Sequence, residues 1–177
     1  LPWNYPIWQV LRFAVPALMS GNACLVKPAP SVPQCSALLL DIVRRAGLAV
    51  LDVAWIDHEA VDDAIRGCDA VAFTGSTTTG RQIAAMAGRH LKKTVLELGG
   101  SDPYIVLEDA DLPHAAAMCA KSRLINNGQS CIAAKRFIVV EGVYDAFEKL
   151  FVAEMEKAAQ RGLTPLEAIA SITKDTL

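Results

Sequence analysis

The chain has 177 residues, of which 53% are hydrophobic and 20% charged, and it carries a formal net charge of −2. This composition excludes an intrinsically disordered chain and predicts a packed core. Because the charge is near neutral and no basic block occurs, we expect no nucleic-acid partner. Charged residues interrupt the longest apolar stretches well before the roughly 20 apolar residues that cross a bilayer, so we expect no membrane partner.

The cysteines are dispersed, without the paired spacing of a zinc site or a disulfide framework; they are Cys24, Cys35, Cys68, Cys119 and Cys131. An odd, scattered set is typical of free thiols in a reducing compartment, so we expect a cytoplasmic protein. The three histidines do not cluster with the cysteines, and we expect no bound metal. Free cysteines are commonly buried, and we expect this of Cys24, Cys68 and Cys119.

Apolar periodicity predicts helices and strands that alternate along the chain. The first half is predicted to contain a helix over 7–19, which Pro16 bends or ends, a strand over 23–26, a helix over 36–46 stopped by Gly47, a strand over 53–56, a helix over 59–66 and a strand over 70–73. The second half is predicted to contain a helix over 80–90, strands over 94–98 and 104–107, a helix over 112–126, a strand over 137–140 and a helix over 145–160.

Short apolar strands between amphipathic helices indicate βαβ units, with a parallel sheet covered on both faces. The predicted fold class is therefore α/β. Ligands of such sheets bind at the carboxyl ends of strands, and three candidate loops follow predicted strands, beginning at Lys27, Gly75 and Gly99.

The hydroxyl-rich segment from Gly75 to Gly80 lies between a predicted strand and a predicted helix. Such a turn offers backbone N–H groups and a positive helix end to a phosphate. It is not a P-loop, because Arg81 and Gln82 stand where that motif needs lysine and serine or threonine. An ordinary N-capped helix is the alternative.

Cys131 differs from the other cysteines because Gly128, Gln129 and Ser130 precede it directly. This polar setting favours an accessible thiol, and the cations of Lys135 and Arg136 lie close in sequence.

Glu97 lies inside an apolar strand, directly before Leu98 and two glycines. Strand alternation can point its carboxylate to solvent; if it faces a cleft instead, it is a candidate general base.

Five segments, in this order, resemble the hallmark motifs of the aldehyde dehydrogenase superfamily; they are residues 2–6, 25–28, 73–77, 96–100 and 128–131. The spacing between Glu97 and Cys131 also resembles that of the family. Within these motifs the residues are most similar to the bacterial succinate-semialdehyde dehydrogenase branch, a similarity carried by residues 6–13, 32–35 and 99–103.

The resemblance implies an incomplete aldehyde dehydrogenase fold. Residues 1–98 would form part of a Rossmann-like NAD(P)-binding domain, and residues 99–158 part of a catalytic domain. Residues 159–177 are expected to be a tail that does not resemble the family's sequence. Full-length family members are expected to be homo-oligomers, and the state of this chain stays open.

The resemblance also implies a mechanism. The Cys131 thiolate attacks a small-molecule aldehyde, and the Asn4 amide and the Cys131 backbone N–H stabilise the oxyanion. Hydride transfer to a nicotinamide leaves a thioester, and Glu97 activates the water that hydrolyses it. Transfer of the acyl group to coenzyme A is disfavoured, because a glutamate at this position suits hydrolysis.

By the same resemblance, Trp3 and Ser76 lie near the cofactor pyrophosphate and Lys27 near the adenosine ribose. The remaining expected cofactor-binding residues are Gly75, Gly80, Leu98 and Gly99. Pro30 departs from the pattern, because many NAD-preferring members have a glutamate there that binds the ribose hydroxyls. Without that carboxylate a 2′-phosphate is not repelled, so the cofactor is NAD or NADP.

Arg12 matches an arginine that contacts the substrate carboxylate in succinate-semialdehyde dehydrogenases, which implies a semialdehyde substrate. A solvated helix arginine or an internal ion pair is the alternative.

Family members are longer at both ends, and missing sheet partners would leave edge strands and apolar faces exposed. The competing functional class is therefore a truncated, non-catalytic remnant that at most binds a nucleotide or a full-length homologue.

Overall fold

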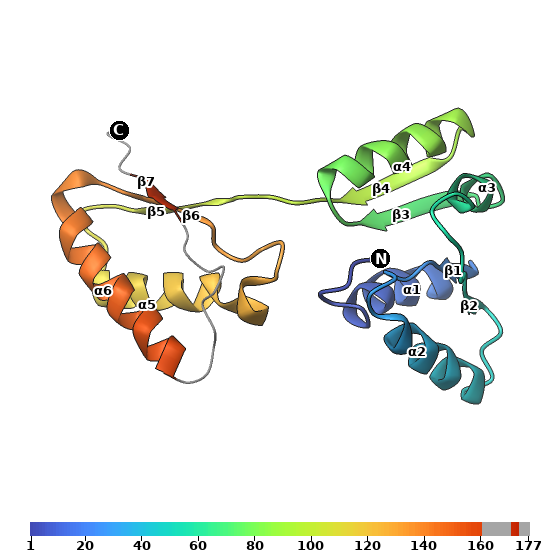
Figure 1. Ribbon diagram of the computed structural model, residues 1–177, viewed down its shortest axis with the longest axis horizontal. Coiled ribbons are helices and arrows are strands. Elements are labelled where there is room, and N and C mark those ends of the chain that lie inside the picture. The colour runs from blue at the N-terminus through green and yellow to red at the C-terminus, as the bar shows by residue number, and fades with distance from the viewer. Residues whose placement is uncertain (161–170, 174–177) are drawn as a thin grey trace. The chain divides into compact units, whose positions relative to one another are not determined.

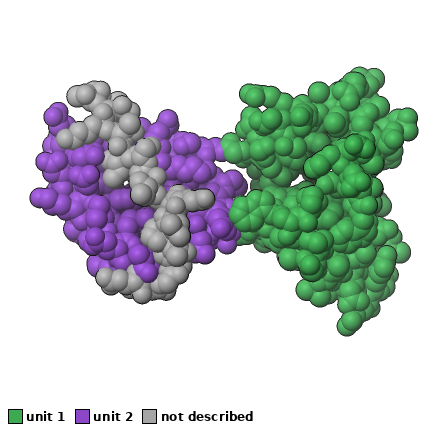
Figure 2. All heavy atoms as spheres, in the orientation of Figure 1, with its two compact units in different colours: residues 1–99 green, residues 100–177 purple. Residues whose placement is uncertain are grey.

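The computed structural model describes residues 1–160 and 171–173. It divides into two compact units, Leu1–Gly99 and Gly100–Leu177 (Figure 2). Both combine α-helices with short strands, and every strand pairing that the structure describes is parallel (Figure 1). The predicted α/β class is confirmed. Most of the predicted tail, at 161–170 and 174–177, lies outside the described residues.

The first unit contains two parallel strand pairs. Its elements are α1 (Trp8–Met19), β1 (Cys24–Val26), α2 (Pro33–Arg45), β2 (Leu51–Val53), α3 (Val61–Arg66), β3 (Ala70–Thr74), α4 (Thr77–Arg89) and β4 (Lys93–Glu97). Strand β1 pairs with β2, and β3 pairs with β4 so that Thr74 lies opposite Glu97. One apolar core joins α1 and α2 to the β1–β2 pair; it contains Val10, Ala14, Cys24, Val26, Leu39, Leu40, Leu51 and Val53.

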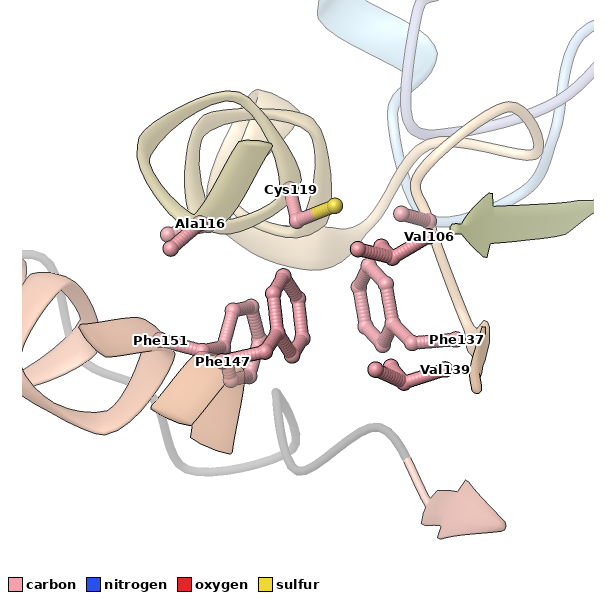
Figure 3. Close-up of a cluster of buried hydrophobic side chains, with 9 residues drawn as sticks. Val106, Ala116, Cys119, Phe137, Val139, Phe147 and Phe151 are labelled. Atoms are coloured by element: carbon pink, nitrogen blue, oxygen red, sulfur yellow. The ribbon is translucent and has the colours of Figure 1, made fainter. Parts of the chain in front are cut away.

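The second unit contains a three-stranded parallel sheet in the order β5–β6–β7. Its elements are β5 (Pro103–Val106), α5 (Leu112–Arg123), a 3-10 turn η1 (Ile125–Gly128), β6 (Arg136–Val139), α6 (Glu141–Gln160) and β7 (Ser171–Thr173). Phenylalanines fill the space between the two helices and the sheet (Figure 3). The ring centroid of Phe151 lies 4.9 Å from that of Phe137 and 5.8 Å from that of Phe147.

Capping groups explain the end of α1, which agrees with the predicted one, and the start of α4, which does not. Pro16 does not end α1, which continues to Met19, and the carbonyl groups of its last turn accept hydrogen bonds from Ser20 Oγ and Asn22 Nδ2. Helix α4 begins at Thr77, three residues before Gly80, because Ser76 caps it: the Thr79 N–H donates to Ser76 Oγ at 3.2 Å.

Further boundaries move for local reasons. Helix α5 ends at Arg123, and Asn126 and Asn127 then take left-handed backbone angles with φ of 50° and 57°, which no α-helix accommodates. Strand β2 begins at Leu51, earlier than predicted, and α6 begins at Glu141.

The expectation that helices cover both sheet faces is wrong for the described residues. Leu25, Val95 and Ile105 each occupy a strand, yet their exposed fractions are 51%, 64% and 58%. The helices of each unit pack against one side of its strands, so the outward side chains of the same strands lack a cover. The sequence predicts these strands from short apolar runs, and such runs do not show whether helices cover one or both faces of a strand pair.

Replacing Phe137 with alanine is expected to destabilise the second unit by about 3–5 kcal/mol, because the ring is fully buried against two other aromatic rings. Urea titration followed by circular dichroism measures the change. Val152→Ala, on the exposed side of α6, is the control and should shift the midpoint much less. Equal shifts for the two variants would contradict this account of the core.

Candidate active site

The predicted site residues are divided between the two units. Cys131 belongs to the second unit, whereas Trp3, Asn4, Arg12, Lys27, Gly75, Ser76, Gly80, Glu97, Leu98 and Gly99 belong to the first. That Cys131, Asn4 and Glu97 act together in one site stays a prediction.

Cys131 stands on a short turn, here called the Cys131 turn (residues 128–134), between η1 and β6. Its side chain is exposed, while the neighbouring Ser130, Ala133 and Ala134 are at most 4% exposed. The Ala133 N–H closes the turn on the Ser130 carbonyl at 3.1 Å, and the Ala134 N–H donates to the Ser122 carbonyl at 3.2 Å. Cys131 is therefore an exposed residue on a turn in which Ser130, Ala133 and Ala134 are buried and hydrogen-bonded through the backbone.

The other thiols lie in different environments. Cys24 and Cys119 are buried, as predicted, and burial raises both pKa values, that of Cys119 to about 11. Cys68 is only half-buried, against expectation. It follows Gly67, which caps the short helix α3. Among the cysteines of the described residues, Cys131 is the one classed as exposed, whereas Cys35 is half-buried like Cys68.

Backbone conformation and a buried arginine shape the segment before the Cys131 turn. Asn126, Asn127 and Gly128 all have positive φ, which L side chains adopt at a cost. A Cβ atom on Gly128 would lie 3.0 Å from Arg123 Nη2, so glycine is favoured there by space as well as by backbone angle. The Arg123 side chain is buried and donates from Nη1 to the Ala134 carbonyl at 3.3 Å.

Sequence reasoning missed Arg123 as a support of the Cys131 turn. A signal was present, because Arg123 continues the helical spacing of the buried residues Ala116, Cys119 and Ala120. An arginine in line with such a stripe needs buried acceptors, and the carbonyl groups that follow the helix end provide one. Helical spacing alone could not show that the Arg123 side chain reaches the Ala134 carbonyl.

Lys135 contacts the Cys131 turn directly. Its Nζ donates to the Gly100 carbonyl at 2.7 Å and to the Cys131 carbonyl at 3.0 Å. The cation noted near Cys131 in the sequence is thus a hydrogen-bond partner of the cysteine's own backbone.

In the first unit, Arg12 and Glu97 form an ion pair. Arg12 Nη2 lies 3.1 Å from Glu97 Oε1, and the two side chains are 51% and 50% exposed. Both line a cavity of about 200 Å³ together with apolar side chains that include Phe13 and Phe73. Glu97 therefore faces a cleft, and Arg12 takes the ion-pair alternative of the two that the sequence left open. An ion pair this exposed contributes only about 0–1 kcal/mol, so the partners separate readily.

The turn after β3 is an N-capped helix start whose first residues are exposed. Ser76 Oγ donates to Thr79 Oγ1 at 2.9 Å and caps the first turn, while Ser76, Thr77 and Thr78 remain exposed. The Gly75 N–H donates to the Glu97 carbonyl at 3.0 Å, which joins this turn to the end of β4. A Cβ on Gly80 would collide with Leu98, so two expected cofactor-binding residues are in close contact.

The other expected cofactor-binding residues lie at the surface or near it. Trp3 and Gly99 are exposed, and Lys27 and Asn4 are half-buried. The Lys27 ammonium donates to the Pro28 carbonyl at 3.4 Å, a long bond that leaves it donors for another acceptor.

Within residues 1–160 and 171–173, no group of three or more histidine, cysteine, aspartate or glutamate side chains is placed to hold a metal ion. Over the same residues, none of the helices has the length and apolarity required to span a bilayer.

Residues 1–170 match the model of the aldehyde dehydrogenase family. The chain belongs to the aldehyde dehydrogenase family. The resemblance of its five motifs is thereby confirmed, and the match extends beyond the last motif into residues after 158.

Curated relatives are similar over most of the chain. A succinate-semialdehyde dehydrogenase [NADP(+)] of Mycobacterium leprae is 48% identical over 160 residues, which are 88% of this chain and 35% of the relative. An aldehyde dehydrogenase of Paenarthrobacter nicotinovorans is 51% identical over 165 residues, 89% of this chain and 35% of the relative. The chain thus spans about a third of the length of the relatives it matches.

Solved structures are similar in fold as well as sequence. A succinic semialdehyde dehydrogenase from Streptococcus pyogenes, in complex with NADP+ as the cofactor, has a TM-score of 0.84 and 36% identity, covering 88% of this chain and 35% of that one. A succinate-semialdehyde dehydrogenase from Burkholderia pseudomallei has a TM-score of 0.83 and 40% identity, covering 88% and 33%.

Iodoacetamide at pH 8 is expected to modify Cys131 about a hundredfold faster than Cys119. Cys131 is exposed, whereas Cys119 is buried and its pKa of about 11 keeps it protonated at this pH. Peptide mass spectrometry over time measures each site. Raising the pH toward 11 should accelerate Cys119, since its thiolate fraction grows through that range, and equal rates at pH 8 would contradict the described burial.

Proposed function

We propose that the protein oxidises an aldehyde to a carboxylic acid with NAD(P), through a covalent intermediate on Cys131. The observation that carries this proposal is the exposed thiol on an anchored turn, in a chain that belongs to the aldehyde dehydrogenase family. We assign residues 1–98 to cofactor binding and residues 99–158 to the nucleophile's domain.

The chemistry begins with attack of the Cys131 thiolate on the aldehyde carbon, which forms a C–S bond and a thiohemiacetal oxyanion. The Asn4 side-chain amide and the Cys131 N–H donate hydrogen bonds to that oxygen. When bound, the nicotinamide supplies the acceptor for the hydride that leaves the same carbon. Glu97 then takes a proton from water, the resulting hydroxide attacks the thioester, and the C–S bond breaks to release the acid and the thiolate.

Residues at the start of α4 fit a dinucleotide pyrophosphate. The backbone N–H groups of the first helical turn have no acceptor within the helix, and Ser76 satisfies that of Thr79 while Thr77 and Thr78 are exposed. Gly80 keeps the helix close to Leu98, where a side chain would not fit.

We infer that NADP is the cofactor. The Mycobacterium leprae relative is named for NADP(+), and the Streptococcus pyogenes structure holds NADP+. In this chain Pro30 is exposed and carries no carboxylate to repel a 2′-phosphate, and the Lys27 ammonium nearby in sequence is a cation that favours one.

We infer that the substrate carries a carboxylate at its far end, as succinate semialdehyde does. Arg12 already holds a carboxylate, that of Glu97, in the cavity that both line. A substrate carboxylate would replace Glu97 as the partner of the guanidinium, and the weak, half-exposed pair opposes this exchange little.

Turnover of succinate semialdehyde with NADP, followed by the near-ultraviolet absorbance of the reduced nicotinamide, tests the proposal. Cys131→Ala is expected to abolish turnover, whereas Cys68→Ala, a matched cysteine substitution away from the Cys131 turn, should retain it. Arg12→Gln should reduce kcat/KM for succinate semialdehyde roughly tenfold to hundredfold and spare a neutral aldehyde.

Turnover that survives Cys131→Ala would refute the role of this thiol. An equal loss for both aldehydes in Arg12→Gln would refute carboxylate recognition by Arg12. Absence of turnover in a folded chain would refute the proposed activity of this chain and favour the non-catalytic alternative.

A further inference from the structure

The side chain of Lys135 joins two backbone segments that are distant in sequence. Its ammonium donates to the Gly100 carbonyl oxygen at 2.7 Å and to the Cys131 carbonyl oxygen at 3.0 Å. An ammonium has three N–H donors and no acceptor, so two of its donors are used on backbone carbonyl groups. The reaction steps above assign no task to this side chain.

Strand pairing explains why one side chain reaches both segments. Strands β5 and β6 run parallel to each other (Figure 1), and Pro103 of β5 lies opposite Arg136 of β6. Gly100 precedes β5 and Lys135 directly precedes β6, so both lie at the amino-terminal end of the pair. The Lys135 ammonium therefore joins the segments that precede β5 and β6, beyond the point where the ladder of backbone hydrogen bonds between the two strands begins.

The two segments carry the proposed chemistry. Gly100 follows Glu97 by three positions in the sequence, and Cys131 is the proposed nucleophile. The carbonyl group and the Cβ atom of Cys131 are bonded to the same peptide unit and Cα atom, so a bond to the carbonyl oxygen at 3.0 Å limits the backbone rotation that sets the direction of the Cα–Cβ bond. Lys135 thus links the Cys131 peptide to Gly100, which lies in the segment between β4 and β5.

The charge of Lys135 adds an electrostatic effect to this restraint. The oxyanion that forms when Cys131 attacks an aldehyde places negative charge beside the Cys131 backbone. A cation that is already held there stabilises this charge without reorganising during the reaction. A methionine of similar length would supply neither the charge nor the donors.

We propose that Lys135 is a positioning residue for the Cys131 nucleophile, which it serves by fixing the Cys131 carbonyl to Gly100 and by holding a positive charge at the turn. The inference rests on the proposed function for the role of Cys131, whereas its contacts lie entirely within the second unit.

The rate at which iodoacetamide alkylates Cys131 tests the proposal without requiring turnover. Lys135→Met, which removes the charge and the donors, is expected to slow this alkylation about tenfold, the effect of losing one charge-assisted interaction. Lys135→Arg keeps both and should restore most of the rate. Lys157→Met is the matched control, because Lys157 lies in the same unit and pairs locally with Glu154 within the described residues, and it should have no effect.

Cys119 serves as an internal reporter of folding in the same samples. It is buried in the core of this unit, so a variant that merely loosened the unit would expose Cys119 and accelerate its alkylation. Slow alkylation of Cys131 in Lys135→Met, together with Cys119 that stays protected from alkylation, supports the proposal. Wild-type alkylation of Cys131 in Lys135→Met, an arginine variant as slow as the methionine one, or rapid alkylation of Cys119 would overturn it.

Turnover assays on the same variants separate this inference from the proposed function. If the chain oxidises aldehydes, Lys135→Met should lower kcat more than it changes KM, and an unchanged kcat would overturn the role of Lys135 alone. If no aldehyde is oxidised yet alkylation of Cys131 follows the expected order, the proposed function fails while the positioning of Cys131 by Lys135 stands.

Discussion

The anchoring of the Cys131 turn between α5 and β6 is the constraint on which the chemistry of the second unit depends. A helix end leaves carbonyl groups without intrahelical partners, and here the Ser122 carbonyl accepts the N–H of Ala134, a residue just past the nucleophile. Arg123, buried at the same helix end, donates to the Ala134 carbonyl. The end of α5 and the beginning of β6 are thereby joined, and Cys131 is left exposed on the short turn between fixed points.

The aromatic core of the second unit supports the two elements, α5 and β6, that hold the Cys131 turn. Phe137 follows the Cys131 turn into β6 and packs on Phe151 of α6, while Cys119 and Ala116 of α5 cover the rings (Figure 3). Because β6 and α5 are the two elements that fix the turn, packing energy in this core supports the position of the thiol. A buried cysteine and an exposed one, twelve positions apart in sequence, thus have opposite roles: Cys119 fills space and Cys131 is available for reaction.

The element order and the fold class were predictable because short apolar runs and helical periodicity are local signals, and all pairings described are parallel, as alternation implies. Helix boundaries were less predictable where a side chain sets them, as Ser76 does for α4. The exposure of Cys131 followed from its polar neighbours, but the Arg12–Glu97 pair joins residues that lie far apart in sequence, which no local pattern reveals. Apolar strands are typical of burial on both faces, so the sequence predicts that Val95 and Ile105 are buried. Both side chains are exposed in the structure, because none of the described residues packs over them. The chain spans about a third of the length of its curated relatives.

The most direct test of the account is the mass of Cys131 peptides after the chain is mixed with succinate semialdehyde and NADP and quenched with acid during the reaction. The account predicts a covalent acyl adduct on the peptide that contains Cys131, which disappears when the reaction is complete and is absent without the cofactor. Oxidation of the aldehyde with an adduct on another cysteine, or with none on Cys131 at any time, would contradict the claim that this anchored, exposed thiol is the nucleophile.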